Sequence, residues 1–319
     1  MKKVLSMVLA LSMLLSLCVL SSVALAEDPI QCYAVTVMSG GAAWGRFEEG
    51  FNEMCASYGW EGHYLAPANA NDGTAMVQLA ETALNNGADV LMVCALEPDL
   101  FTEVLGRARD QGVTVIGVAG GVDGYTEALV GTDAVSLGYN TAEALVAIAG
   151  DNPINVAIGQ TMLSSSLQNE QIDAFLVKLA EIAPDAVIVD RFEMNSNASI
   201  AADRLSALYV AYPDLNASVS FDSYVGMGAA SFVGDYGISD DFFAIGIDDG
   251  SEILLCVKDG TLDATIAQQW YEIGKRSVEV SYQLRVEGQE LEYKQGVPTV
   301  IIYPEDVDAY AEANGIDLN

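Results

Sequence analysis

Residues 34–50, AVTVMSGGAAWGRFEEG, join an apolar run that is typical of a buried strand to the start of a helix. Four apolar side chains then recur at intervals of three and four residues: Phe47, Phe51, Met54 and Tyr58. This spacing places them on one face of a helix, where they can pack against a sheet. The stretch therefore predicts a strand–turn–helix unit whose turn, residues 39–44, contains two glycines and a tryptophan.

The same alternation continues along the chain. Strands are expected at 33–38, 88–93, 113–119, 154–159, 186–192, 217–221 and 242–247. Helical periodicity lies between them, at 44–57, 73–86, 98–111, 137–149, 165–182, 197–211 and 223–234. Alternating strands and helices favour parallel sheets that helices cover on both faces. About nine such units are too many for one sheet of ordinary size, and the glycine-rich segment 120–133 separates two sets. We therefore predict an α/β chain with two doubly wound parallel-sheet lobes.

The first 26 residues differ from the rest of the chain. They begin with two lysines, continue with an apolar run over residues 4–19 and end in small residues. This is the pattern of a secretory signal peptide, here cleaved near Ala26. A membrane anchor, or a lipid attached to Cys18, is the alternative. Export predicts that the mature chain works in the periplasm or at the extracellular face of the cell membrane.

Composition argues against several classes of function. The formal net charge is −32, which opposes binding to nucleic acid. A single histidine, His63, excludes multi-histidine metal sites and argues against a Ser-His-Asp triad; we expect it at a surface or on an edge strand. The glycines of the 39–44 turn fit neither a dinucleotide fingerprint nor a P-loop. We expect no catalytic residues, no cofactor and no metal, and the sequence leaves open whether Cys32 and Cys55 form a disulfide.

In doubly wound sheets the ligand lies outside the carboxyl ends of the strands. The side chains that follow the expected strands are therefore the first candidates for a binding site. They are residues 39–44, 95–97 and 119–121 in the first half, and Gln160, Thr161, Phe221, Asp222, Asp248, Asp249, Gln268, Gln269 and Trp270 in the second.

With these residues placed, residues 33–303 resemble the ribose-binding-protein family of bacterial solute-binding proteins, which serve ABC importers. The most specific stretch is IGIDDGSEILLCVKDGTLDATIAQQWYEIGK, residues 245–275. It is similar to the family's aspartate turn and to its Gly-x-Leu-x-Ala-Thr-x-x-Gln segment. The resemblance implies two lobes joined by a three-crossing hinge that close on a ligand without catalysis. It divides the chain into residues 27–131 plus 269–292 for one lobe and 132–268 plus 293–319 for the other.

The resemblance also exposes departures from the family's polar site. Gln171 stands where the family usually has an arginine, and small or apolar residues replace its polar groups at 95–96 and 119–121. Asp222, Asp248 and Gln268 match the pattern. The predicted ligand-binding set is Ser39, Trp44, Gln171, Phe221, Asp222, Asp248, Gln268 and Trp270.

Each role in this set has an alternative. Trp44 and Trp270 can stack on the apolar faces of a sugar, while Asp248 and Gln268 meet its hydroxyl groups. Trp44 can instead be a core residue of the first helix, and Trp270 can pack at the hinge. Asp222 can instead cap the helix that begins near Tyr224.

The sequence thus predicts a binding protein for a small neutral ligand, with a monosaccharide preferred and an ABC transporter permease as partner. A ligand-binding sensor for a chemoreceptor or sensor kinase is one alternative, and a cationic or nucleoside ligand is another. A secreted enzyme is the least favoured, because the chain offers no nucleophile–base pair and no metal set.

Overall fold

The computed structural model describes residues 28–318. The expected signal peptide, its cleavage site near Ala26 and the lipidation candidate Cys18 lie outside these residues. Within them, no helix is both long enough and apolar enough to cross a membrane.

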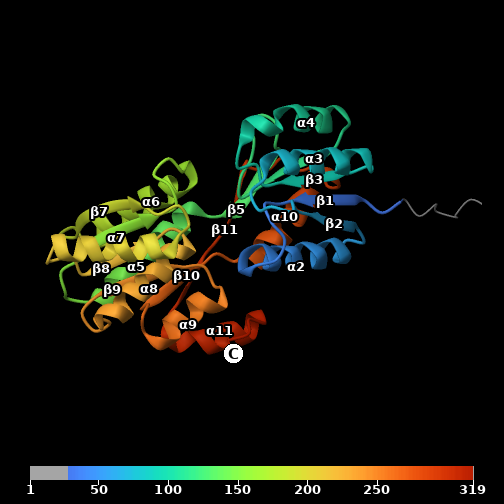
Figure 1. Ribbon diagram of the computed structural model, residues 1–319. Helices are drawn as coiled ribbons and strands as arrows, with labels where there is room; N and C mark the ends of the chain where they lie inside the picture. Colours follow the sequence, from blue (N-terminus) through green and yellow to red (C-terminus); the bar gives the residue numbers. More distant parts are fainter. Residues whose placement is uncertain (1–27, 319) are drawn as a thin grey trace, which may run out of the picture.

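The described chain forms two α/β lobes, each built on a six-stranded sheet (Figure 1). The sheet of lobe one is parallel throughout. Across it, the strands are β11 (Lys294–Val297), β5 (Ala128–Thr132), β4 (Thr114–Val118), β3 (Val90–Val93), β1 (Gln31–Val35) and β2 (Glu61–Leu65). Its helices are α2 (Ala42–Ser57), α3 (Gly73–Asn85), α4 (Pro98–Asp110) and α10 (Trp270–Arg285).

Lobe two repeats this plan, with one antiparallel edge strand, β12, that pairs with β10. Its strands across the sheet are β12 (Val300–Ile302), β10 (Ala264–Ala267), β9 (Phe243–Ile247), β8 (Ala217–Ser220), β6 (Asn155–Gln160) and β7 (Val187–Glu193). Its helices are α5 (Ala134–Ala149), α6 (Ser166–Ile182), α7 (Ala198–Ala211), α8 (Ser223–Tyr236), α9 (Ser251–Asp259) and α11 (Val307–Asn314), with a 3-10 turn at Pro304–Asp306. The predicted α/β architecture with two parallel-sheet lobes is confirmed.

The chain passes between the lobes three times, and the third passage differs from the expected boundary. The passages follow β5, β10 and β11 (Figure 1). The resemblance assigns residues 293–297 to lobe two, but β11 pairs in parallel with β5, with Lys294 opposite Leu129. The third passage therefore lies at Pro298 and Thr299, after Val297. The short, polar sequence of β11, KQGV, carries no strand pattern, and only its pairing places it in lobe one.

Glycines let one helix pair in each lobe approach closely. A Cβ atom on Gly274 of α10 would lie 2.2 Å from the backbone oxygen of Phe47 in α2. A Cβ atom on Gly138 of α5 would lie 2.4 Å from the backbone oxygen of Gln171 in α6. These contacts leave no room for a side chain, so each glycine helps to position a predicted site residue: Trp270 at the start of α10, and Gln171 on α6.

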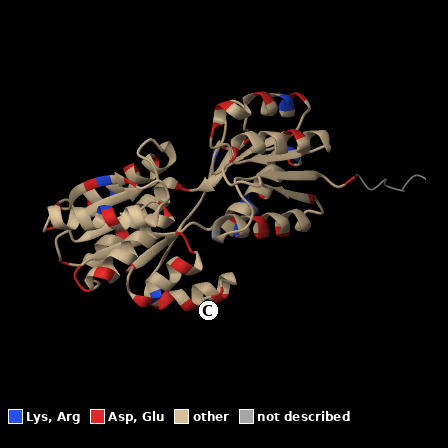
Figure 2. Ribbon diagram, viewed as in Figure 1, with Lys and Arg blue, Asp and Glu red and all other residues tan. Residues whose placement is uncertain are grey.

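Lobe one contains the cysteine pair and the histidine that the sequence singled out. Cys32 and Cys55 are buried as free thiols. Burial and the neighbouring Cys55 thiol raise the pKa of Cys32 well above its usual value. His63 lies on the edge strand β2 and stacks on Tyr33 with ring centroids 4.3 Å apart, as an edge residue. Acidic side chains are spread over the helices of both lobes and outnumber basic ones (Figure 2).

Candidate ligand-binding cleft

Two cavities lie between the lobes. We name the first the hinge cavity; it measures about 310 Å³ and is bordered by the passages after β5 and β10 and by strand β11. We name the second the acidic cavity; it measures about 340 Å³ and lies between the turn after β1 and the first turns of α8 and α9. Both cavities sit at carboxyl ends of strands, where a doubly wound sheet is expected to bind a ligand.

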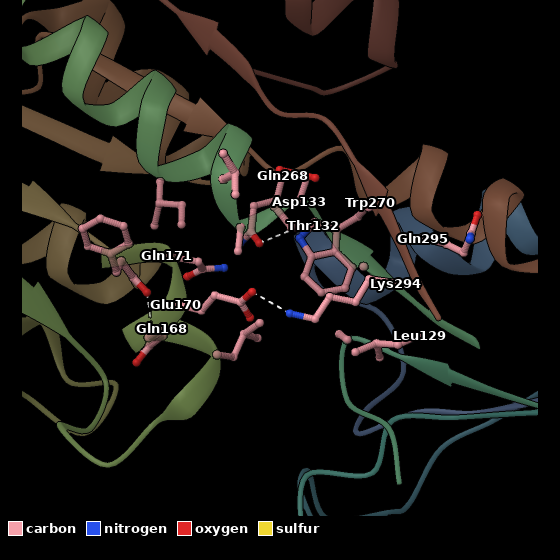
Figure 3. A pocket seen from close by; sticks show the side chains of 18 residues that line it. Leu129, Thr132, Asp133, Gln168, Glu170, Gln171, Gln268, Trp270, Lys294 and Gln295 are labelled. Carbon is pink, nitrogen blue, oxygen red and sulfur yellow. Dashed lines mark hydrogen bonds and ion pairs between the residues drawn. The ribbon is translucent and has the colours of Figure 1, made fainter. Parts of the chain in front are cut away.

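The hinge cavity is lined by both apolar and polar side chains, and the labelled polar ones come from both lobes (Figure 3). Its apolar and small residues are Ala119, Leu129, Gly131, Ala134, Val135, Leu167, Phe221, Ile247, Trp270 and Gly296. Its polar residues are Thr132, Asp133, Gln168, Glu170, Gln171, Gln268, Lys294 and Gln295. The acidic cavity has a different character, because three carboxylates line it: Asp248, Asp249 and Glu252.

A chain of hydrogen bonds joins the first two passages. Thr132 Oγ1 donates to Gln268 Oε1 at 2.7 Å, and Gln268 Nε2 donates to Asp248 Oδ1 at 2.7 Å. Ser223 Oγ donates to the other carboxylate oxygen of Asp248. The network connects lobe one to the carboxyl end of β9 and orients the planar groups of Gln268 and Asp248 together. Each oxygen of Asp248 keeps a further lone pair that can accept a hydrogen bond from a ligand.

Asp248 occupies an unusual position in both backbone and charge. Its φ of 73° lies in the left-handed region, which aspartate tolerates better than most residues. Burial raises the pKa of its carboxyl group above the usual value, and the nearby charge of Asp222 adds to this. The hydrogen bonds from Ser223 and Gln268 act in the opposite direction, because they stabilise the charged form.

Trp270 stands between the two cavities and, among the described residues, is the only one that lines both. Its ring lies 5.0 Å from that of Trp44, tilted by 48°. The indole Nε1 atom is buried without a hydrogen-bond partner among residues 28–318. It is nevertheless close enough to the Asp248 carboxylate to favour the charged form, which lowers the pKa of that group.

Gln171 and Phe221 face the hinge cavity from lobe two. Gln171 is 3% exposed, and its side chain points into the cavity (Figure 3). Its amide forms no hydrogen bond with any residue in the described part of the chain. Phe221 follows β8 and packs edge-on against Phe175, with ring centroids 6.0 Å apart. Because this amide faces the cavity, its donor and its acceptor are available to a ligand there.

The other predicted residues lie differently. Trp44 is 8% exposed, packs on Phe47 with centroids 5.6 Å apart, and lines the acidic cavity, so it serves the core as well as the cleft. Ser39 is exposed and lines neither cavity, whereas Gly40 and Gly41 beside it do line the acidic one.

Asp222 acts as a helix cap, the alternative that the sequence left open. Its Oδ1 atom accepts a hydrogen bond from the backbone N–H of Tyr224 at 2.8 Å, at the start of α8. Its Oδ2 atom accepts one from Thr161 Oγ1 at 2.5 Å. It lines neither cavity.

Sequence reasoning missed two polar pairs that border the cleft. Lys294 of lobe one forms an ion pair with Glu170 of lobe two, with Nζ and Oε1 2.5 Å apart. The hydroxyl of Tyr310, in the last helix, donates to Asp249 at 2.7 Å. Burial raises the pKa of Asp249 to about 6. The partners in each pair are far apart in sequence and leave no local pattern, so only the tertiary structure brings them together.

The groups that meet in the cleft are carboxylates, amides and indole rings, which are suited to hold a small molecule by hydrogen bonds and ring contacts. In the described part of the chain, no cluster of three or more histidine, cysteine or acidic side chains could hold a metal ion.

Comparisons with known proteins agree with this architecture. The periplasmic binding protein domain family matches residues 33–290. The ribose import binding protein RbsB of Bacillus subtilis (strain 168) is 24% identical over 218 residues, which make up 66% of this chain and 68% of that protein.

Solved structures of similar shape include the arabinose-binding protein AraP of Geobacillus stearothermophilus, with a TM-score of 0.81 at 19% identity, covering 88% of this chain and 99% of that one. A periplasmic ribose ABC transporter protein of Conexibacter woesei DSM 14684 gives a TM-score of 0.80 at 18% identity, covering 89% and 95%. A solute-binding protein of Actinobacillus succinogenes 130z with bound D-allose gives a TM-score of 0.76 at 20% identity, covering 89% of this chain and 100% of that one.

Proposed function

The chain belongs to the periplasmic binding protein family, and from that premise we propose that it captures a small neutral solute, a monosaccharide, for an ABC importer. The protein works outside the cytoplasmic membrane and passes its ligand to the permease of the importer. It binds the solute and leaves it chemically unchanged. The names of similar proteins support the sugar, because they refer to ribose, arabinose and D-allose.

The observation that carries this proposal is the network of Asp248 and Gln268 beside the indole of Trp270. A sugar ring has hydroxyl groups around its rim and apolar C–H groups on its faces. Planar carboxylates and amides accept and donate hydrogen bonds at defined angles, which suits the rim. Aromatic rings cover the faces. Here these two kinds of group lie together on elements from both lobes: Gln268 lines the hinge cavity, Asp248 lines the acidic cavity, and Trp270 lines both.

Capture follows from the position of the site between the lobes. A ligand that touches both lobes stabilises the arrangement in which they are close, so it shifts the population toward the closed form. The three passages between the lobes act as the hinge. The permease then distinguishes a loaded protein from an empty one by this change of shape.

A thermal-shift panel of the purified mature protein tests the proposal. Neutral monosaccharides should raise the melting temperature, because they bind only the folded form. Mass analysis of the tightest ligand after incubation should return it unchanged. A recovered product would contradict a binding role, and a panel in which no neutral sugar shifts the melting temperature would contradict the ligand class.

A cation is the second candidate ligand, and the acidic cavity is the observation that favours it. Asp248, Asp249 and Glu252 line this cavity together with Trp44 and Trp270. Carboxylates and indole faces both attract positive charge. Polyamines and quaternary amines therefore belong in the same panel. If one of them binds more tightly than every neutral sugar, the ligand is a cation.

A further inference from the structure

We propose that Lys294 and Glu170 act as a clasp between the lobes, which forms when the lobes close and slows their reopening. The clasp holds a sugar in the hinge cavity until the pair breaks. Neither residue belongs to the predicted ligand-binding set. The clasp rests on the proposed function and deepens it, because it concerns how the same site retains its ligand.

The place of this ion pair in the fold is the first support. Lys294 lies on β11 in lobe one and Glu170 on α6 in lobe two, with Nζ and Oε1 2.5 Å apart. Both border the hinge cavity, and their side chains point toward one another (Figure 3). Of the ion pairs among residues 28–318, this one alone joins the two lobes. Separation of the lobes therefore has to break it.

The charge of the rest of the protein is the second support. The formal net charge is −32, and acidic side chains outnumber basic ones in both lobes (Figure 2). Like charges repel, so two acidic lobes resist approach unless an attraction offsets the repulsion. Among the described residues that line the two cavities, Lys294 is the only basic one. Its ammonium group therefore provides a charge attraction that closure over the hinge cavity otherwise lacks.

A second contact between the lobes has the same polarity. Arg46 on α2 of lobe one donates from Nη2 to Asn314 Oδ1 at 3.4 Å, in the last helix of lobe two. Burial raises the pKa of Asp249 in lobe two, and the nearby positive charge of Arg46 acts in the opposite direction. Lobe one thus presents basic groups to acidic groups of lobe two beside each cavity.

The exposure of the pair limits the strength of the clasp. The Lys294 and Glu170 side chains are 64% and 48% exposed. An exposed ion pair is weak, because water screens it and two long side chains lose conformational freedom. Its loss changes a rate or an equilibrium by about 1.5- to 5-fold. A pair of this strength slows release but still lets the lobes open, as delivery to a permease requires.

Release rates measured by stopped-flow tryptophan fluorescence test the clasp, since Trp270 borders the hinge cavity. The probe is the tightest-binding of D-ribose, D-arabinose and D-allose. Lys294→Met and Glu170→Gln should each speed its release about 1.5- to 5-fold. The double variant should release it no faster than the single ones, because either change alone already breaks the pair.

Lys258→Met is the matched control. Lys258 is an exposed lysine that pairs with Asp308 at 2.6 Å, but both residues lie in lobe two and outside both cavities. This variant loses the same charge from the protein without touching the contact between the lobes. Its release rate should equal that of the unmodified protein.

Exchange of the two charges gives a sharper test. Lys294→Glu alone should speed release more than Lys294→Met, because it places two carboxylates opposite each other. Lys294→Glu combined with Glu170→Lys restores an ion pair, so release should be slower than from either reversed single variant. Salt gives an independent readout: between about 0.05 and 0.5 M NaCl, release should accelerate more for the unmodified protein than for Lys294→Met, since the sugar carries no charge.

Two results overturn the clasp. Unchanged release from both Lys294→Met and Glu170→Gln would do so. Effects that add in the double variant would do so as well, because they would make each side chain a separate contact to the sugar. Both results leave the proposed function intact.

Failure of all three sugars to bind counts against the proposed function and not against the clasp. Small-angle scattering of the protein without ligand then decides. Lys294→Glu should have a larger radius of gyration than the variant with exchanged charges, because only the latter keeps the attraction between the lobes. Equal radii would overturn the clasp.

Discussion

Replacement of Asp248 by alanine should weaken binding of the tightest neutral sugar by about 1.5–3 kcal/mol, which is the range for a hydrogen bond to a charged group. This corresponds to an increase in Kd of about 10- to 150-fold. The estimate follows from the position of the carboxylate, whose oxygens accept from Ser223 and Gln268 and keep lone pairs for the ligand. Alanine would also leave Gln268 without the acceptor that orients it.

The effect of this change on stability should be smaller, because opposing contributions partly cancel. Burial raises the pKa of this carboxyl group, so its charged form is unfavourable in the folded protein. Its removal by alanine therefore stabilises the fold. Alanine also removes two hydrogen bonds and places a less suitable residue at a φ of 73°. We expect a net change on the order of 1 kcal/mol in the free energy of unfolding.

Isothermal titration of Asp248→Ala, with Asp248→Asn as the matched control, separates hydrogen bonding from charge. Asparagine keeps the size, the planar shape and the tolerance of the left-handed backbone, and one oxygen can still accept from Gln268. Asp248→Asn should therefore bind more tightly than Asp248→Ala. If a folded Asp248→Ala variant binds the sugar with unchanged affinity, the residue supports Gln268 and does not contact the ligand, and the reasoning is refuted.

Four further results are expected. Trp44→Ala should cost at least about 1 kcal/mol of binding free energy in titration, the scale of one aromatic contact; unchanged affinity would make Trp44 a core residue only. Sugar acids and sugar phosphates should bind at least about tenfold more weakly than the neutral sugar, because the acidic cavity repels them; a sugar phosphate as the tightest ligand would reverse this reading. Small-angle scattering should give a smaller radius of gyration with saturating ligand, and an equal radius would mean that the lobes do not close. Asp249 holds its proton more tightly in the folded protein, with a pKa of about 6 against a usual 3.8. Its contribution to stability is therefore present below about pH 4 and is lost as the pH rises through 6. When the pH rises from about 4 to 7.5, the free energy of unfolding of Asp249→Asn, measured with urea, should increase by about 2–3 kcal/mol relative to that of the unchanged protein.

Local patterns account for what the sequence predicted well. The helix expected at 98–111 is observed as α4, Pro98–Asp110, because its apolar spacing is decided within the helix itself. The position of Asp248 beside a cavity could be predicted because a residue that directly follows a strand stays at the sheet edge in any doubly wound fold.

The rest depends on tertiary contacts. Asp222 also follows a strand, and sequence could not choose between ligand contact and the cap that the structure shows. The resemblance singled out Gln171, but the free amide depends on which neighbours surround it. Lys294 and Glu170 meet only because β11 pairs with β5 in the sheet of lobe one. The polar KQGV sequence contains no pattern that predicts this strand pairing.

The threading of the chain also has a consequence for the order of folding. Each sheet receives an edge strand from the last part of the sequence: β11 completes one and β12 completes the other. Domains usually fold as units while the chain is being made, beginning at the amino terminus. Here neither sheet has all six of its strands until residues 294–302 have been synthesised. Both lobes therefore lack an edge strand until almost the whole chain has been synthesised. The two sheets then gain their last strands at nearly the same time.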